Sequence, residues 1–388
     1  MKITKIEVIR LRPPVALSTR GELLSQHGMR AEFLAGGIGN NQADRQWSMS
    51  DDGFSDTYRL RQTRYEAFLK GNPDDSEDAS GHPGSDVVCK VHTDEGLIGL
   101  SDSPPANAEF FIGRSPFEFI GDDSVGAFQM ALYDLMGKAT GQPAARLIGP
   151  VLRTRIFVSY WSHCYPPEVM RSEAARAVEM GFKAHKIKRR PLYDVVEQVE
   201  AMSEVIPEDY RIEIDSNTTL RTPARAIALA RSLERFPNVV ALEEPIPQDD
   251  IAGYRHLRAS QHLPIIVDRP DIHGPGYWRA IASGMCDGLK IGTYGVSHLR
   301  QNATLAEEGG HIPFFSDSGG LGIGCTFLVH ILATIRNATL PHSLAVYRTE
   351  KDVTSNLMKV RDGYVHLPEG PGLGVELDED AIDKYRVD

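Results

Sequence analysis

The stretch Gly181-Phe-Lys-Ala-His-Lys-Ile-Lys-Arg-Arg190 decides our expectation of the fold, because a helical pattern gives way there to a short predicted strand. Successive residues of a strand face opposite ways, so Lys186 and Lys188 are expected on one face. Two ammonium groups on one face repel each other, which favours loss of a proton from one and makes a lysine a base. Lys-x-Lys also occurs on the solvated face of an edge strand. The sequence downstream decides between the two interpretations.

From Arg155 onward, short β-branched runs alternate with helical patterns. The predicted strands end near Tyr160, Lys188, Asp215, Glu243, Asp268, Lys290, Ser316 and Tyr347. The five central charged residues lie between 22 (290 minus 268) and 28 (243 minus 215) residues apart. Such a regular spacing fits a (β/α)8 barrel of the TIM type, whose charged strand ends all face one mouth. A doubly wound sheet gives a similar spacing, but eight units favour closure.

Three acidic residues stand at the ends of the third, fourth and fifth predicted strands, namely Asp215, Glu243 and Asp268. Adjacent carboxylates repel each other unless a cation lies among them, and oxygen-only ligands indicate Mg²⁺ and not zinc. A single Asp at a strand end often caps the next helix, but three in consecutive units make that reading a poor one. Lys290 ends the sixth strand, which lies opposite the second in a ring of eight. Lys188 and Lys290 are therefore expected to face each other across the metal.

The amino-terminal third predicts a smaller antiparallel sheet. One strand covers Ile3 to Leu11, and residues 87–91 and 97–100 form a hairpin that turns at Asp94-Glu-Gly96. A helix over residues 125–136 should pack on this sheet and end at Gly141-Gln-Pro143. The long stretch 14–85 is expected to be an irregular insertion, apart from helical spacing over residues 57–70.

The composition is that of an ordinary globular protein, with 41% hydrophobic and 24% charged residues in 388. A formal net charge of −11 argues against nucleic acid or an anionic membrane as the main partner. Four cysteines lie far apart without a Cys-x-x-Cys motif, so we expect buried thiols in a reducing compartment. No signal peptide and no apolar run of about 18 residues is apparent, so a cytoplasmic protein without membrane contact is expected.

The whole chain resembles the mandelate racemase and muconate lactonizing enzyme family of the enolase superfamily. The resemblance rests on these motifs: Gly181-Phe182, Lys186-x-Lys188, Asp215-x-Asn217, Glu243-Glu244-Pro245, Asp268, Lys290, Ala131-Leu-Tyr-Asp-Leu-Met-Gly-Lys138 and Gly370-Pro-Gly-Leu-Gly-Val-Glu-Leu-Asp378. It implies an α+β capping domain over residues 1–150, with the insertion 14–85, above a modified barrel over residues 151–360. Residues 361–388 would return to the cap. A homo-oligomer is also expected.

The resemblance also implies residue roles. Lys188 and Lys290 would be acid/base catalysts, with Lys186 tuning Lys188, and Asp215, Glu243 and Asp268 would hold Mg²⁺. Enolase-type sites use such a base and Mg²⁺ to stabilise an enediolate. We further expect four residues to bind substrate, namely Asn217, Arg269, Asp317 and Tyr160.

The chain departs from the family pattern at several positions. Arg269 follows Asp268 where the family often has a second acid, so it would rebalance charge at the metal or bind an anionic substrate. Asp317-Ser318 stands where relatives often carry Glu-Ser, and the glycines after it would either hold an anion or form a bend. The eighth strand lacks the Asp-x-Asp of dipeptide epimerases, which disfavours dipeptide substrates.

The sequence thus predicts a Mg²⁺-dependent enzyme that removes the α-proton of a small carboxylate and acts as a racemase, epimerase or cycloisomerase. The alternative is an acid-sugar or hydroxy-acid dehydratase. A rival from another class is a noncatalytic carboxylate-binding protein. Metal-dependent turnover, as against metal-dependent binding alone, separates the rival from the enzyme.

Overall fold

The computed structural model describes residues 1–11, 86–162, 164–189, 193–291, 295–314, 321–344 and 352–387. The whole insertion 14–85 lies outside these residues, and with it the predicted helix over residues 57–70. Asp317 and the strand ends at Ser316 and Tyr347 lie outside them as well.

Three antiparallel strands form the small sheet in the order β1-β2-β3. They are β1 (Ile3–Leu11), β2 (Asp86–Thr93) and β3 (Ile98–Ser101). Ile3, Ile9, Leu11, Val88 and Val91 are buried and belong to the hydrophobic core. The predicted strand, hairpin and antiparallel pairing are confirmed.

The helix α5 (Gln129–Thr140) packs on β3 and ends at Gly141, whose left-handed φ of 67° is of the kind a glycine C-cap supplies. It begins later than the sequence predicts, because the residues before it form the 3-10 segment η4 (Asp123–Phe128). Every residue from Gln129 to Gly137 is buried, so the helix is enclosed and not half-exposed. Two more 3-10 segments, η2 (Glu109–Phe111) and η3 (Pro116–Phe119), and the helix α6 (Ala144–Ile148) complete this part of the chain.

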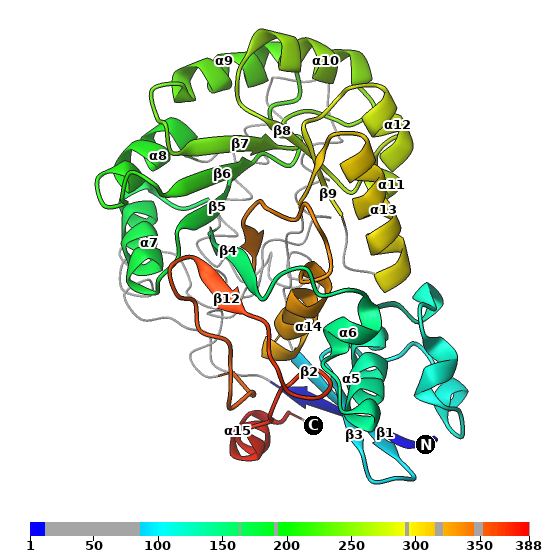
Figure 1. Ribbon diagram of the computed structural model, residues 1–388. Coiled ribbons are helices and arrows are strands. Elements are labelled where there is room, and N and C mark those ends of the chain that lie inside the picture. The colour runs from blue at the N-terminus through cyan, green and yellow to red at the C-terminus, as the bar shows by residue number, and fades with distance from the viewer. Residues whose placement is uncertain are drawn as a thin grey trace, which may run out of the picture.

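The second sheet contains nine strands, eight of them in one path with the order β10-β9-β8-β7-β6-β5-β4-β11. Every pair along that path is parallel. The strands are β4 (Arg155–Ser162), β5 (Ala184–Lys188), β6 (Arg211–Asp215), β7 (Val239–Glu243), β8 (Ile265–Asp268), β9 (Gly288–Lys290), β10 (Ile312–Phe314) and β11 (His342–Ser343). The path curls into a modified (β/α)8 barrel, with its helices on the outside (Figure 1). The expected fold class is confirmed.

Helices follow the strands, as the alternating pattern predicts. They are α7 (Pro167–Glu179), α8 (Val195–Ser203), α9 (Pro223–Leu233), α10 (Ile251–Ser260), α11 (Pro270–His273), α12 (Tyr277–Ala282), α13 (Val296–Glu308) and α14 (Gly322–Leu332). The apolar residues Ile187, Ile214 and Leu242 are fully buried and cross-strand neighbours, and they alternate with charged residues on the other face of each strand. That other face lines the barrel, so its charges need partners there.

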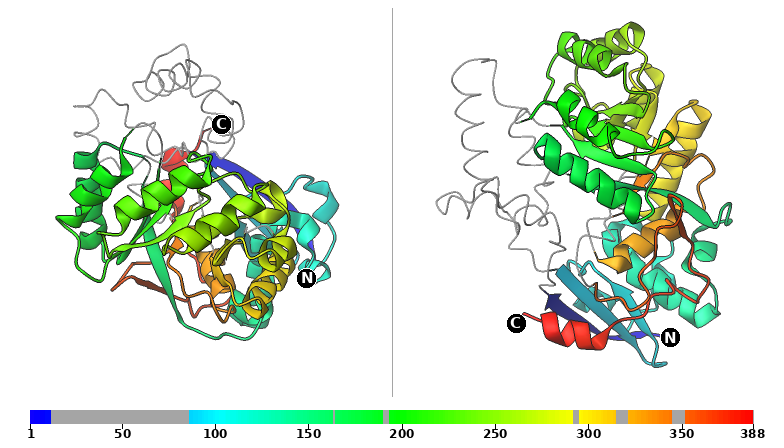
Figure 2. Two further views of the ribbon diagram at one scale, coloured as in Figure 1. Left: turned by 90° about the horizontal axis from the view of Figure 1, so that it is seen from above. Right: turned by 90° about the vertical axis from the view of Figure 1, so that its left-hand side faces the viewer.

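The last part of the chain runs from the barrel to the small sheet. The strand β12 (Tyr364–His366) pairs antiparallel with β4. Further on, Leu373 N donates to Asp134 of α5, and α15 (Glu379–Tyr385) lies beside β1 and β2 (Figure 2). The chain therefore reaches the cap after β12.

All four cysteine thiols are buried and unbridged, as expected. Burial raises the pKa of Cys89 and of Cys286 to about 12. Within the described residues, no helix has both the length and the apolar character that crossing a membrane requires.

Candidate active site

Strand register brings the charged residues to one end of the barrel. Lys188 pairs with Asp215 and Asp215 pairs with Glu243 across three neighbouring strands, and Asp268 pairs with Lys290 across the next two. All five residues are at most 3% exposed. Charges buried to this extent are stable only in mutual contact. The carboxyl ends of the strands thus hold one connected charge cluster.

Lys186 and Lys188 do share a face, as the sequence predicts. Both ammonium groups contact the same oxygen, Asp215 Oδ2, at 3.3 Å from Lys186 and 2.5 Å from Lys188. Lys186 Nζ also donates to Glu243 Oε2, and Lys188 Nζ donates to Asn217 Oδ1 at 2.9 Å. The carboxylates therefore offset the repulsion between the two lysines.

Lys290 and Arg269 hold the other side of the cluster. Lys290 Nζ lies 3.5 Å from both Glu243 Oε1 and Asp268 Oδ1. Arg269 contacts both oxygens of Asp268, with Nε 3.0 Å from Oδ1 and Nη2 3.4 Å from Oδ2. Burial raises the pKa of Asp268, but Lys290 and Arg269 outweigh burial and hold that pKa at about 2. Asp268 is thus a carboxylate.

The donor chemistry of the cluster fits Mg²⁺. Asp215, Glu243 and Asp268 offer only carboxylate oxygens, which are the ligands this ion prefers. Glu243 Oε1 is buried and accepts no hydrogen bond from any described residue, so it has a lone pair to offer. As the described side chains lie, however, no three His, Cys, Asp or Glu side chains converge into a chelating group, because cations lie between the carboxylates.

The backbone turns sharply behind each predicted ligand. Asn217, Glu244 and Arg269 have positive φ values of 40°, 44° and 38°, although none of them is glycine. Each follows an acidic strand end by one or two residues. Left-handed residues with side chains are strained and gather at functional sites, where the surrounding structure holds them. The three turns fold the side chains of Asn217, Glu244 and Arg269 back toward the cluster.

Two more acidic residues belong to the cluster, although the sequence assigns no role to either. Glu213 precedes Asp215 by two residues on β6 and lies 3.5 Å from Lys186, and burial raises its pKa well above the ordinary value. Glu244 accepts from Asn217 Nδ2 at 3.2 Å and from Gln248 Nε2 at 2.8 Å. Strand parity alone places Glu213 inward with Lys186, so this signal was present in the sequence.

Tyr160 does not join the cluster. It pairs with His185, whereas Trp161 pairs with Lys186, so Trp161 is the residue of β4 on the barrel-facing side. The Tyr160 hydroxyl donates to Glu173 of α7 at 3.2 Å, and its ring lies edge-on to His185 at 4.9 Å. The expectation that Tyr160 faces the substrate missed the strand parity by one residue.

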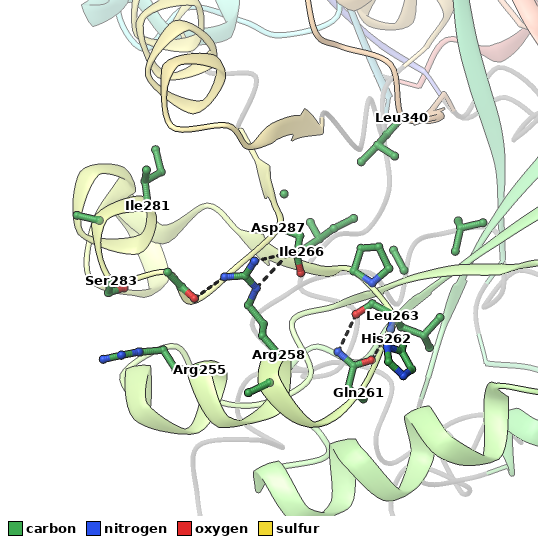
Figure 3. Close-up of a pocket in the computed structure, with 17 residues that line it drawn as sticks. Arg255, Arg258, Gln261, His262, Leu263, Ile266, Ile281, Ser283, Asp287 and Leu340 are labelled. Atoms are coloured by element: carbon green, nitrogen blue, oxygen red, sulfur yellow. Dashed lines mark hydrogen bonds and ion pairs between the residues drawn. The ribbon is translucent and has the colours of Figure 1, made fainter.

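A cavity of 690 Å³ lies at the other end of the barrel strands. Its lining includes Val240, Ala241, Ile266 and Gly288, near the amino ends of β7, β8 and β9 (Figure 3). The charged residue Arg258 lines it as well, but its Nε donates to Asp287 Oδ1 at 3.1 Å. The charge cluster at the carboxyl ends of the strands therefore lies away from this cavity.

Comparisons with known proteins agree with this arrangement. A family model described as "Enolase C-terminal domain-like" matches residues 169–381. N-succinyl-L-Arg/Lys racemase of Bacillus cereus is 24% identical over 342 residues, which cover 78% of this chain and 90% of that protein. Arabinonate dehydratase of Saccharolobus solfataricus is 26% identical over 305 residues, covering 76% and 79%. The crystal structure of muconate cycloisomerase from Pseudomonas fluorescens has a TM-score of 0.71 at 17% identity, covering 100% of this chain and 99% of that one.

Proposed function

Because the chain belongs to the mandelate racemase and muconate lactonizing enzyme family of the enolase superfamily, a family of isomerases and lyases, we propose that it removes the α-proton of a small carboxylate with Mg²⁺ as cofactor. The observation that carries the proposal is the connected cluster of three strand-end carboxylates with Lys186, Lys188 and Lys290. We favour an isomerase, that is, a racemase, epimerase or cycloisomerase.

Asp215, Glu243 and Asp268 would hold the ion. When bound, Mg²⁺ would supply a positive charge that offsets the negative charge developing on the substrate carboxylate. The proton next to a carboxylate is very weakly acidic, so this stabilisation is needed before a lysine can remove it.

The two outer lysines would handle the proton on opposite sides of the substrate. Lys188 on β5 and Lys290 on β9 are separated by the three strands that carry the carboxylates. Asn217 orients Lys188 through its side-chain oxygen, and Lys186 shares Asp215 Oδ2 with Lys188, which couples the charges of the two lysines. One base on each face permits inversion, whereas one base and one acid permit elimination of a leaving group.

The alternative is an acid-sugar or hydroxy-acid dehydratase, and the same experiment distinguishes it. A panel of N-succinyl amino acids and sugar acids would be incubated with the enzyme and Mg²⁺ in deuterated water. Uptake of deuterium at the α-carbon without loss of water indicates an isomerase, and loss of water indicates a dehydratase. Both outcomes are read by mass spectrometry.

On the substrate so found, we expect Lys188→Ala to abolish α-proton exchange of one stereoisomer and Lys290→Ala to abolish exchange of the other. For a dehydratase, one variant should lose exchange and the other should mainly slow loss of water. Removal of a general base typically costs 10²–10⁴-fold in rate. Lys183→Ala is the matched control, because Lys183 precedes β5 and pairs at the surface with Asp209 and Asp362. Wild-type turnover in either barrel variant would refute the two-base mechanism.

A further inference from the structure

Arg269 holds an unusual position beside one of the proposed metal ligands. Neighbouring residues of a strand point to opposite faces, so a residue seldom contacts the side chain next to it. Here the left-handed φ of 38° ends the strand and folds the guanidinium back onto both oxygens of Asp268. The Arg269 backbone N–H donates to Lys290 O at 3.0 Å, and Pro270 follows, so the turn is firmly placed.

The two sides of this ion pair differ in exposure. The Asp268 side chain is fully buried, whereas 15% of the Arg269 side chain is exposed. The carboxylate is therefore enclosed in the barrel, whereas part of the Arg269 side chain remains exposed. The planar guanidinium of Arg forms its strongest pairs with carboxylates and phosphates, through two parallel hydrogen bonds.

A divalent cation on Asp215, Glu243 and Asp268 would meet positive charge already present. Lys290 lies 3.5 Å from both Glu243 and Asp268, and Arg269 contacts Asp268. A lysine can relieve the repulsion by releasing its proton, but an arginine keeps its charge at any ordinary pH. Arg269 can relieve it only by moving away from Asp268.

We propose that Arg269 exchanges between two anions, Asp268 in the metal-free site and a second anionic group of the substrate when Mg²⁺ is bound. The inference rests on the proposed function, since it takes Asp268 as a ligand and a carboxylate as substrate. It adds that the substrate carries two anionic groups, a first carboxylate at the metal and a second one for Arg269. It also adds that Mg²⁺ and such a substrate favour each other's binding, since each removes an obstacle to the other.

Mg²⁺ binding measured by titration calorimetry tests the first half. We expect Arg269→Gln to bind Mg²⁺ about tenfold more tightly than the wild type, within the usual range of such couplings. Arg258→Gln is the matched control, because it removes the same charge from an Arg–Asp pair at the far end of β9 (Figure 3). It should leave Mg²⁺ affinity unchanged. Arg269→Lys is a second variant for the case that the Gln variant folds poorly. It keeps the positive charge but not the two parallel hydrogen bonds to Asp268. We expect it to bind Mg²⁺ more tightly than the wild type but less tightly than Arg269→Gln.

Two probes of equal carbon number test the second half. Succinate carries two carboxylates and butyrate one, so the wild type should bind Mg²⁺ more tightly with succinate than with butyrate. In Arg269→Gln the two probes should act alike. Equal Mg²⁺ affinity of wild type and Arg269→Gln, or equal effects of the probes on the wild type, overturns the exchange while leaving the proposed function intact. If neither the wild type nor Arg269→Gln binds Mg²⁺, the metal site is refuted, and with it both proposals. If only Arg269→Gln binds Mg²⁺, the exchange is supported, because the Arg269 charge then prevents Mg²⁺ binding in the wild type.

Discussion

At the scale of single residues, the site depends on backbone conformations that side chains seldom adopt. Asn217, Glu244 and Arg269 are left-handed behind three successive strands, and each makes a side-chain contact within the cluster. Their strain is maintained because the strand ends around them are fixed by parallel pairing. Position 269 thus combines an unfavourable conformation with a charge that pairs with Asp268.

Two substitutions at position 269 separate the conformation from the charge. Both Arg269→Gly and Arg269→Ala remove the guanidinium, but only glycine accepts a φ of 38° without strain. We expect the Gly variant to be more stable than the Ala variant by about 1 kcal/mol, reversing the usual order of the two residues. Urea unfolding without metal measures the difference. An Ala variant as stable as the Gly variant would show that the turn relaxes when the arginine is absent.

The sequence identifies most residues of the charge cluster but not their backbone conformations. Strand-end spacing finds Lys188, Asp215, Glu243, Asp268 and Lys290, because charge at a buried strand end is rare without a purpose. It misplaces Tyr160, because the sequence of β4 does not show which of two neighbouring residues, Tyr160 or Trp161, faces inward. Left-handed turns at Glu and Arg leave no signal in a single sequence, since glycine or asparagine would be expected there.

At the scale of elements, the cap holds one barrel helix by its first turn. Asp123 of η4 accepts from the backbone N–H groups of Ser297, at 3.0 Å, and His298, at 2.6 Å, both in α13. Gln129 Oε1 accepts from Val296 N at 2.9 Å. A helix start needs such acceptors, and here a segment far away in the chain supplies them. Since α13 follows β9, the cap is connected directly to the strand that carries Lys290.

Loss of this capping is expected to cost stability. Asp123→Ala should lower the free energy of unfolding by about 1–2 kcal/mol, because two backbone donors of α13 lose a charged acceptor. Asp122→Ala is the control, since Asp122 caps only Ser124 within its own segment. Chemical unfolding of both variants, with hydrogen exchange at residues 296–298, measures the effect. Equal stability and exchange in the two variants would contradict a role for the contact between domains.

The order and type of the elements could be largely predicted, because apolar periodicity and strand-end charges are local signals. The small sheet and the parallel strands from β4 to β9 agree with the predicted positions. The start of α5 and its burial over residues 129–137 could not be predicted, since they follow from contacts with segments far away in the chain. The capping of α13 by Asp123 is of the same kind, because it joins residues 174 apart.

At the scale of the whole molecule, one buried histidine connects three segments. His330 in α14 accepts from Ala145 N through Nδ1 at 3.2 Å, and its Nε2 donates to Leu373 O at 3.0 Å. The ring is therefore neutral, and burial lowers the pKa of His330 to about 4. Protonation would place a hydrogen on Nδ1 and break the contact with Ala145.

This histidine predicts how stability changes with pH. Its folded pKa of about 4 lies below the ordinary value of about 6.5, so the unfolded chain binds the extra proton first as the pH falls. His330 therefore contributes full stability above about pH 6.5 and loses it progressively down to about pH 4. Between pH 6.5 and 5 the loss should reach about 2 kcal/mol.

The variant His330→Gln keeps a donor for Leu373 and cannot titrate. It should lose about 2 kcal/mol less than the wild type between pH 6.5 and 5, whatever its stability at pH 7. Urea unfolding at both pH values provides the comparison. Parallel losses in the two proteins would mean that His330 is already solvated in the folded state.

The fold class could be predicted at this scale, but the path of the last residues was predicted only in outline, through the family resemblance. Asp134 accepts from Leu100 N at 2.9 Å, Lys138 Nζ at 2.7 Å and Leu373 N at 2.8 Å, so one carboxylate joins three parts of the cap. The sequence shows the Gly370-Pro-Gly-Leu373 motif but no partner for it. Its partner follows only from the fold in three dimensions.

The contacts that join the last residues to the cap have a consequence for synthesis on the ribosome. Strand β1 emerges first, but Arg10 O accepts from Val387 N at 2.9 Å, and Asp134 receives Leu373 only after every barrel strand has emerged. A nascent chain can therefore assemble its barrel while the first strand still lacks its last neighbours. A translational pause before Gly370 would leave apolar surface of the cap uncovered for chaperones to bind.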